Sequence, residues 1–149
     1  MRATKAVTKA TEAHVGRIQD TEQFLERDLG IPVKLNRAYE VAISAQVLAK
    51  PGFRAYDLRG HGGAVMKNRT LRFRVGRCTV PALYRVYWKI RNTGEEAIRA
   101  KDIRGRIEAD QGNYMRDENT KYRGKHYVEC YVVKNGVCAA MAHQVVVIK

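Results

Sequence analysis

Apolar side chains recur at every second position along most of this chain, and this periodicity limits the folds that it can adopt. The stretches "AYEVAISAQVLA", "TLRFRVGR" and "LYRVYWKIRN" alternate apolar and polar residues from Tyr39 onward. Two more such runs flank the turn "KNG", and "DIRGRIEA" is a further short one. A period of two places successive side chains on opposite faces of a strand, so roughly five or six strands joined by turns are expected. The pattern predicts a mainly β protein, built as a β-sandwich or a small barrel.

The residues before this region predict a helix. Apolar side chains recur there at roughly helical spacing, at Val15, Ile18, Phe24, Leu25 and Leu29. Asp20 suits a helix N-cap, Gln23 takes the capping-box position after it, and Gly30 is a C-terminal stop signal. We therefore divide the chain into an N-terminal helical segment with linker, residues 1–37, and a β-rich domain, residues 38–149. Two stretches, "RGHGGA" and "DQGNYMRDENTKYRGK", are expected to form loops.

Cysteine usage and missing motifs exclude several classes of protein. Cys78, Cys130 and Cys138 form no CxxC pair, which favours reduced thiols in a cytoplasmic protein over a disulfide framework or a zinc site. No apolar run reaches membrane-spanning length, and no secretory signal is visible. Walker, HExxH and nucleophile-elbow motifs are absent from the sequence. We expect a non-catalytic binding protein with no metal, no cofactor and no membrane partner.

The positive charge of the chain is concentrated in its middle third. The net charge is +13, and residues 50–107 hold 15 basic against 4 acidic side chains, or +11. Residues 1–49 hold 7 against 6, and residues 108–149 hold 6 against 5, so each flank contributes only +1. Such a concentration of charge attracts polyanions, and it favours a ligand that carries phosphate. A solvated basic face without any partner is the alternative.

Alternation sorts the charged side chains by strand face. Arg72 and Arg74 share one face of their strand. The polar face of the following strand carries three cations: Arg85, Lys89 and Arg91. The only tryptophan, Trp88, falls on the opposite, apolar face, where core packing is its simplest role. If the strand ends at the rim of a pocket, the indole could instead stack on a base beside Asn92.

The polar turn "NTGEE" and the run "YRGKHYVECY" add further candidates. The two glutamates of the turn serve only to form the turn, or they recognise a base by accepting hydrogen bonds from the amino group on its edge. His126 and Glu129 lie an odd number of residues apart, so a strand places them on opposite faces and a shared metal or acid–base site is disfavoured. We expect His126 to be buried or to act as a cap. Glu129 lies between Tyr127 and Tyr131 on one face, as a structural hydrogen-bonding cluster or a base-reading patch. Tyr122 and Tyr127 stand among cations, a mixture that suits base stacking beside phosphate.

Several of these motifs together resemble a known family. They are "VYWKIRNTGEEA", "IRGRI", "TKYRGKHYVECYVVKNGVCAA" and "VVVI", in this order between about Ala38 and Ile148. The chain resembles the AGS-C family, the adenylyl/guanylyl and SMODS C-terminal sensor domain. The motif positions of the family fall on Trp88, Asn92, Thr93, Gly94, Glu95, Glu96, Arg104, Gly105, Thr120, Tyr122, Gly124, His126, Glu129, Asn135 and Cys138.

The resemblance implies a β-rich sensor of a nucleotide or cyclic oligonucleotide in bacterial antiphage defence of the CBASS type. Members of the family commonly follow a cGAS/DncV-like nucleotidyltransferase, which is the implied partner domain on the N-terminal side. No nucleotidyltransferase motif is present in this sequence. The chain is therefore expected to be either a piece of a longer protein or an independent sensor that acts with a separate enzyme.

These considerations give a set of expected ligand contacts. Phosphate contacts are expected from Arg72, Arg74, Arg85, Lys89, Arg91 and Arg104. Base contacts are expected from Trp88, Asn92, Tyr122, Tyr127 and Glu129. The alternative function is a general RNA- or DNA-binding module that senses phage nucleic acid, with affinity that falls steeply with salt. A signal-degrading enzyme and a protein-docking module are further alternatives, and no catalytic constellation in the sequence supports the enzyme.

Overall fold

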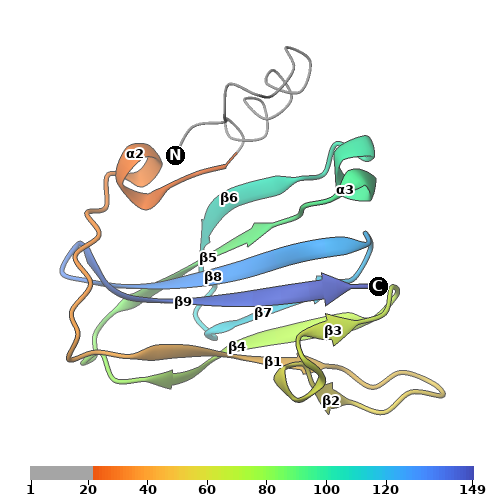
Figure 1. The fold of residues 1–149 in the computed structure, drawn as a ribbon. Coiled ribbons are helices and arrows are strands. Elements are labelled where there is room, and N and C mark those ends of the chain that lie inside the picture. Colours follow the sequence, from red (N-terminus) through yellow and green to blue (C-terminus); the bar gives the residue numbers. More distant parts are fainter. Residues whose placement is uncertain (1–21) are drawn as a thin grey trace.

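Two β-sheets packed face to face make up the protein, as the computed structural model shows for residues 22–149, the part of the chain that it describes (Figure 1). The four-stranded sheet has the order β2-β1-β4-β7, with β1 at Val41–Val47, β2 at Tyr56–Asp57, β4 at Thr70–Cys78 and β7 at Met115–Asn119. The five-stranded sheet has the order β3-β9-β8-β5-β6, with β3 at Ala64–Val65, β5 at Arg85–Arg91, β6 at Arg104–Ala109, β8 at Gly124–Lys134 and β9 at Val137–Ile148. Three short helical turns complete the fold: α2 at Leu25–Leu29, the 3-10 turn η1 at Arg59–His61 and α3 at Glu95–Arg99. The predicted mainly β sandwich is confirmed, whereas a barrel is wrong, because no strand pairing within residues 22–149 joins the two sheets.

The core lies between the sheets and follows from the alternation of apolar side chains. Leu71 and Phe73 of β4 point inward from one sheet, and Val86, Trp88 and Ile90 of β5 point inward from the other. Trp88 is only 1% exposed, which confirms that its face is the buried one. Its indole N–H donates a hydrogen bond of 2.9 Å to a carboxylate oxygen of the Asp110 side chain, so the one polar atom of the ring keeps a partner inside the core.

The hairpin at the C-terminal end of the chain and the end of α2 also agree with the sequence. β8 and β9 pair antiparallel along their whole length around the turn Asn135–Gly136. Both turn residues have positive φ, 52° and 77°, which is the backbone that Asn-Gly favours in a two-residue hairpin turn. Gly30 closes α2 in the left-handed conformation, at φ 67°, as predicted.

The capping-box assignment near α2 is wrong. The helix begins at Leu25, and its N-cap residue, Phe24, has no side-chain oxygen with which to cap it. Gln23 instead uses its side-chain oxygen to accept a hydrogen bond of 2.7 Å from the backbone N–H of Ile107 in β6. Asp20 and the rest of the helix predicted before it lie outside the described residues. None of the helices described between residues 22 and 149 is long and apolar enough to cross a membrane.

Residues 22–37, which we assign to the N-terminal segment, lie on the outer face of the five-stranded sheet. Leu25 is buried there in a second apolar cluster with Ile107, Tyr131, Val133 and Cys138. Farther along, the backbone N–H of Cys138 donates to the carbonyl of Pro32 at 2.9 Å, and that of Lys34 donates to the carbonyl of Cys138 at 3.0 Å. The boundary between residues 37 and 38 stays a prediction, but the segment before it covers one face of the sheet.

The run predicted as a long loop after β6 contains a strand, β7, so the loop assignment is wrong over Met115–Asn119. β7 pairs antiparallel with β4, with Phe73 opposite Arg116 and Leu71 opposite Glu118. Arg116 and Glu118 therefore share the inner side of the sheet with two core residues. Because these inward positions are charged, the strand shows no apolar alternation in the sequence.

An ion-pair ladder explains why charged side chains are tolerated at that position. β6 and β7 are edge strands of different sheets. Glu118 pairs with Arg104 of β6 at 2.5 Å and with Arg116 at 3.1 Å, and Arg116 pairs with Glu108 of β6 at 2.6 Å. Side-chain charges thus connect the two sheet edges where no backbone pairing joins them, and inward-pointing charges also protect exposed strand edges from pairing with other chains.

Candidate functional site

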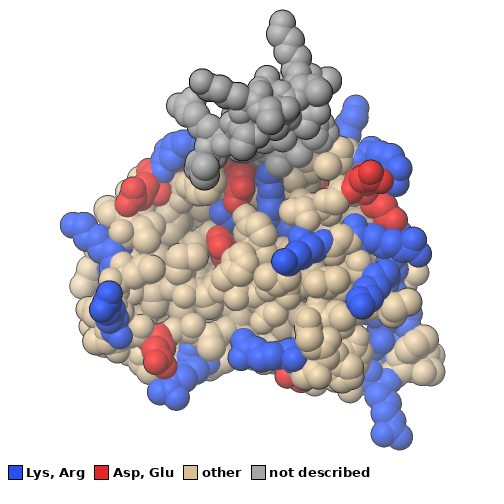
Figure 2. All heavy atoms as spheres, in the orientation of Figure 1, with Lys and Arg blue, Asp and Glu red and all other residues tan. Residues whose placement is uncertain are grey.

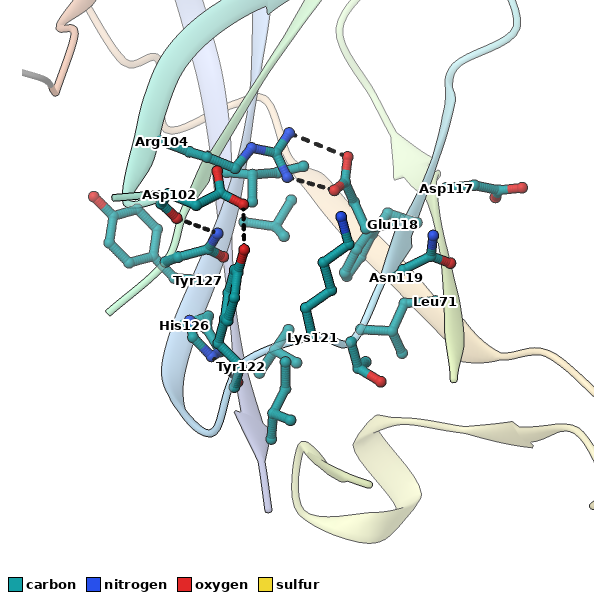
Figure 3. Close-up of a pocket in the computed structure, with 17 residues that line it drawn as sticks. Leu71, Asp102, Arg104, Asp117, Glu118, Asn119, Lys121, Tyr122, His126 and Tyr127 are labelled. Carbon is teal, nitrogen blue, oxygen red and sulfur yellow. Dashed lines mark hydrogen bonds and ion pairs between the residues drawn. The ribbon is translucent and has the colours of Figure 1, made fainter. Parts of the chain in front are cut away.

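A pocket opens between the two sheets at one end of the sandwich, where β5 and β7 end and β4 and β8 begin (Figure 3). Its volume is about 220 Å³. The floor is apolar and is formed by Leu71, Phe73, Ile90, Val128, Val146 and Ile148. The walls and rim are polar and comprise Asn92, Asp102, Arg104, Asp117, Glu118, Asn119, Thr120, Lys121, Tyr122, His126 and Tyr127. An apolar floor with a few converging polar groups is the usual make-up of a small-molecule site.

Close packing of two loops shapes one wall of this pocket. A Cβ atom added to Gly124 would lie 2.5 Å from the carbonyl oxygen of Thr93, closer than any side chain tolerates. Gly94 is almost as confined, because its added Cβ would lie 3.0 Å from the carbonyl oxygen of Arg123. The stretch after β5 and the stretch before β8 can therefore approach only because both carry glycine where the backbones meet.

His126 joins these two stretches and is 4% exposed, which confirms the expectation of a buried or capping histidine. Its Nδ1 accepts a hydrogen bond of 2.9 Å from the backbone N–H of Thr93, and its Nε2 lies 2.7 Å from the carbonyl oxygen of Tyr122. This pattern corresponds to a neutral ring that carries its proton on Nε2. Burial lowers the pKa of the imidazole below its ordinary value, and the hydrogen bond to Tyr122 only partly opposes that effect. His126 thus fixes the pocket wall and does not provide a charge to it.

The polar wall is an ordered set of hydrogen bonds (Figure 3). The phenol of Tyr122 donates to the carboxylate of Asp102 at 2.8 Å. The side-chain amide of Asn92 donates to the backbone carbonyl of Asp102 at 2.8 Å. In Figure 3, Tyr122 and Lys121 stand on opposite sides of the opening, with the Arg104–Glu118 pair across one end of it.

The charges of the pocket walls are mixed and leave no net positive charge. Two carboxylates, those of Asp102 and Glu118, face two cations, those of Arg104 and Lys121, whereas the carboxylate of Asp117 turns away to Arg72 on the outer face of the four-stranded sheet. Glu118 already binds Arg104. Burial lowers the pKa of Arg104, but the hydrogen bonds that its guanidinium donates to Glu118 outweigh burial and raise that pKa. The interior therefore suits a neutral, flat group that offers hydrogen-bond donors, because its charges balance and offer a phosphate no excess positive charge.

Tyr127 borders the pocket, but its ring turns to the outer face of the five-stranded sheet. Three other residues predicted to contact a ligand come together at this pocket: Asn92, Arg104 and Tyr122. They come from the end of β5, the start of β6 and the approach to β8, so segments far apart in the sequence meet here.

Lys89, Arg91 and Glu129 lie instead on the outer face of the five-stranded sheet, beneath the N-terminal segment. Lys89 and Arg91 are each 3% exposed. The ammonium of Lys89 lies 2.9 Å from one carboxylate oxygen of Glu22 and 3.5 Å from Glu129. Arg91 lies 3.8 Å from the other oxygen of Glu22 and donates to the backbone carbonyl of Arg104 at 2.8 Å. Both cations are buried with carboxylate partners, which leaves them poorly placed to receive phosphate.

Glu22 is the centre of this buried network. Its carboxylate also accepts a hydrogen bond from the phenol of Tyr127, whose ring lies on this outer face and stacks on His143. Burial raises the pKa of Glu22, but the hydrogen bonds from Tyr127 and Lys89 outweigh it and hold that pKa below its ordinary value. Glu129 accepts from the phenol of Tyr131 at 2.6 Å and lies 2.8 Å from Nδ1 of His143. These contacts favour the structural hydrogen-bonding interpretation of Glu129.

The remaining predicted contacts lie elsewhere in the molecule. Arg72 and Arg74 are on the outer face of the four-stranded sheet, and Arg72 forms two hydrogen bonds of 2.8 Å with Asp117 across the β4–β7 pair. Arg85 is exposed at the start of β5, at the far end of that strand from the pocket. Trp88 is in the core. The structure does not bring these four residues to the pocket.

Sequence reasoning missed several pocket residues, namely Asp102, Glu118, Asn119 and Lys121. Glu118 and Asn119 were hidden because β7 was taken for a loop. Thr120 and His126 were signalled only by the motif positions of the family. Among residues 22–149, no three His, Cys, Asp or Glu side chains are grouped so that they could hold a metal ion.

Residues 19–149 match the family described as Adenylyl/Guanylyl and SMODS C-terminal sensor domain, which confirms the resemblance drawn from the motifs. The match includes every residue that lines the pocket. No curated protein matches the chain.

Proposed function

The chain belongs to the adenylyl/guanylyl and SMODS C-terminal sensor domain family. From that premise we propose that it senses a nucleotide or cyclic oligonucleotide by binding one base in the pocket at the end of the sandwich. The observation that carries this proposal is the convergence of motif residues on one cavity. Asn92, Arg104, Thr120, Tyr122 and His126 are motif positions, and all of them line it.

The shape of the pocket supports a base as the buried part of the ligand. A cavity of about 220 Å³ is smaller than the roughly 300–1,000 Å³ of drug-sized sites, so it suits one base or nucleoside and excludes a whole cyclic oligonucleotide. The apolar floor would take the ring, and the ring of Tyr122 offers a surface for stacking. Asp102 and Glu118 would accept hydrogen bonds from amino groups on the base edge.

The phosphates of such a ligand would stay outside, at the rim. Lys121 is exposed at the mouth of the pocket. Lys67 lies nearby, paired with Glu96 of α3 at 2.6 Å, and Glu96 also accepts from the backbone N–H of Arg123 at 3.0 Å. Ligand phosphate is a stronger acceptor partner for these cations than solvent, and it would compete with Glu96 for Lys67.

The role in the cell follows from the same premise. We place the protein in the cytoplasm, in bacterial antiphage defence of the cyclic-oligonucleotide type, attached to or acting on a cGAS/DncV-like nucleotidyltransferase or an effector. The domain would turn over no nucleotide. Bound ligand would shift the conformational equilibrium of the attached protein by no more than its differential affinity for the two states.

Native mass spectrometry tests the proposal. The protein is measured as purified and after incubation with a panel of linear and cyclic nucleotides. We expect one discrete mass addition, corresponding to a single unhydrolysed nucleotide species. The addition should be lost in Tyr122→Leu and kept in the matched variant Tyr84→Leu, which removes a half-buried tyrosine at the other end of β5. Persistence of the adduct in Tyr122→Leu would rule out the pocket, and conversion of the nucleotide would rule out a non-catalytic sensor.

The alternative function, general binding of RNA or DNA, is favoured by the net charge of +13. It predicts no small-molecule adduct in the same experiment. It also predicts that affinity for bulk nucleic acid falls steeply with salt, because many phosphate contacts each release counterions.

A further inference from the structure

A second feature beside the pocket carries a strong positive charge. The connection between β1 and β4, residues 50–69, is named here the basic loop. It holds five cations, Lys50, Arg54, Arg59, Lys67 and Arg69, and a single carboxylate, that of Asp57. Figure 2 shows Lys and Arg side chains at the right-hand end of the molecule, the end where Figure 1 places α3, β2 and β3. Of these cations, only Lys67 takes part in the phosphate contacts proposed above.

The basic loop is held in one conformation by a buried arginine. Arg69 is 6% exposed, and one guanidinium nitrogen donates to the backbone carbonyls of Leu48 at 2.9 Å and Arg54 at 3.1 Å. Its guanidinium also lies 5.0 Å from the ring centroid of Phe53 and 5.6 Å from that of Tyr56. A loop that is already ordered loses little further entropy when it binds a ligand.

The outward side of the basic loop combines cations with an aromatic ring. Phe53 is 54% exposed, although it is a large apolar side chain. Arg54, which follows it directly in the sequence, and Arg59, six residues after it, are both exposed. The carboxylate of Asp57 is turned toward the backbone N–H of Gly60, 3.3 Å away. Exposed cations around aromatic surfaces are the arrangement with which proteins follow the backbone of a single-stranded nucleic acid.

The basic loop is attached directly to the pocket. Thr120 and Lys121 line the pocket, and Thr120 is only 1% exposed. The hydroxyl oxygen of Thr120 accepts from the backbone N–H of Arg69 at 2.8 Å, and its own N–H donates to the carbonyl of Arg69 at 2.9 Å. The N–H of Asn68 donates to the carbonyl of Thr120 at 2.8 Å. A phosphodiester chain that leaves a base in the pocket therefore meets the end of the basic loop next, at Lys67, and the rest of the loop beyond it.

We propose that the basic loop binds the phosphodiester backbone of an oligonucleotide whose base occupies the pocket, so that the sensor responds to a nucleotide chain and not to a mononucleotide. This inference rests on the proposed function, because it takes the pocket as the base site. The chain could be linear or cyclic, since both present the same phosphodiesters. The walls of the pocket carry no net positive charge and the basic loop carries an excess of it, so the two features divide the ligand between them.

Calorimetric titration with three kinds of probe tests this inference. The probes are the mononucleotides AMP and GMP, linear single-stranded RNA and DNA of about ten nucleotides, and the cyclic dinucleotides of A and G. The test variant is Arg54→Glu with Arg59→Glu. The control variant is Arg37→Glu with Arg77→Glu, which makes the same change of net charge at exposed positions before β1 and near the far end of β4. Thermal unfolding followed by Trp88 fluorescence establishes that each variant is folded.

We expect at least one oligonucleotide probe to bind about tenfold or more tightly than either mononucleotide at about 100 mM salt. The test variant should lose that excess and the control variant should keep it. The slope of log K against log salt for linear probes should fall by about 0.7 for each phosphate contact removed. Whether the linear or the cyclic probe shows the excess identifies the source of the chain. If the test variant is unfolded, Arg54→Gln with Arg59→Gln makes the same comparison with a smaller change.

Other outcomes would overturn one proposal or the other. Mononucleotides that bind as tightly as every oligonucleotide would refute the role of the basic loop and leave the pocket intact. An equal loss in the test and control variants would refute it as well, because it would show nonspecific attraction. Oligonucleotide binding that survives Tyr122→Leu but not the test variant would refute the pocket as base site and retain the basic loop as the binding surface.

Discussion

Replacing Glu22 by glutamine removes the carboxylate that Lys89 and Arg91 share beneath the N-terminal segment. Lys89 is 3% exposed, and its ammonium lies 2.9 Å from Glu22, so loss of the charge leaves a cation inside the protein with fewer partners. Glutamine keeps the size of the side chain and can still accept a hydrogen bond from Tyr127. The substitution therefore tests the charge alone.

The structure sets the size of the expected effect. Removing one partner of a fully buried ion pair costs about 3–5 kcal/mol. Here Lys89 keeps Glu129 at 3.5 Å and the backbone carbonyl of Gln23 at 3.1 Å, and Arg91 keeps the carbonyl of Arg104. The remaining contacts compensate in part, so we expect Glu22→Gln to lower the free energy of unfolding by about 2–3 kcal/mol.

Urea unfolding followed by the fluorescence of Trp88 measures this change, because the only tryptophan is buried and becomes exposed on unfolding. The matched control is Glu40→Gln, which removes the charge from an exposed pair with Arg77 and should cost less than about 1 kcal/mol. Adding Lys89→Met to Glu22→Gln should restore most of the lost stability, since an apolar side chain needs no carboxylate. If Glu22→Gln is no more destabilising than Glu40→Gln, the N-terminal segment is not held on the sheet by buried charge.

Two further changes test the wall of the pocket. Burial holds the pKa of His126 below its ordinary 6.5, so its contribution to stability is present above about pH 6.5 and is lost as pH falls toward the folded pKa. Urea titrations from pH 7 to 5 should show this loss of unfolding free energy in the parent protein and a smaller loss in His126→Gln, which can keep both hydrogen bonds without titrating. An equal dependence of unfolding free energy on pH in the two proteins would contradict the assignment. Gly124→Ala places a Cβ 2.5 Å from the carbonyl oxygen of Thr93 at a φ of 147°, so we expect the free energy of unfolding to fall by about 2 kcal/mol or more and nucleotide binding to weaken. The control is Gly112→Ala, at positive φ but with open space around it. Equal losses of unfolding free energy in both variants would show that backbone conformation alone matters.

Local pattern predicted the strands and the faces of their side chains, but not which faces other segments cover. Alternation correctly put Lys89 and Arg91 opposite Trp88. It could not show that this polar face is buried, because the covering residue, Glu22, lies 67 positions away from Lys89 in the chain. The cations that read as a phosphate-binding surface are therefore part of a buried network.

The pocket was predictable to the extent that its residues lie on recognisable motifs. Asn92 was identified as the polar residue beside Trp88, Tyr122 because it stands among cations, and Arg104 as one of the cations of the basic middle third. Their partners Asp102 and Glu118 were not, because a carboxylate pairs with a specific cation through tertiary structure that no local pattern encodes. β7 escaped for the same reason, since its inward side chains are matched to charges on β6 and not to the apolar core.

Titration of the isotopically labelled protein with the nucleotide that gives the mass addition, followed by backbone NMR shifts, tests the central claim most directly. The account predicts that the largest changes fall on the residues that line the pocket, at Asn92, Asp102–Arg104 and Asn119–His126, with smaller ones in the basic loop. Changes confined to the outer face of either sheet, or spread evenly over all basic residues, would contradict a base-binding pocket between the sheets.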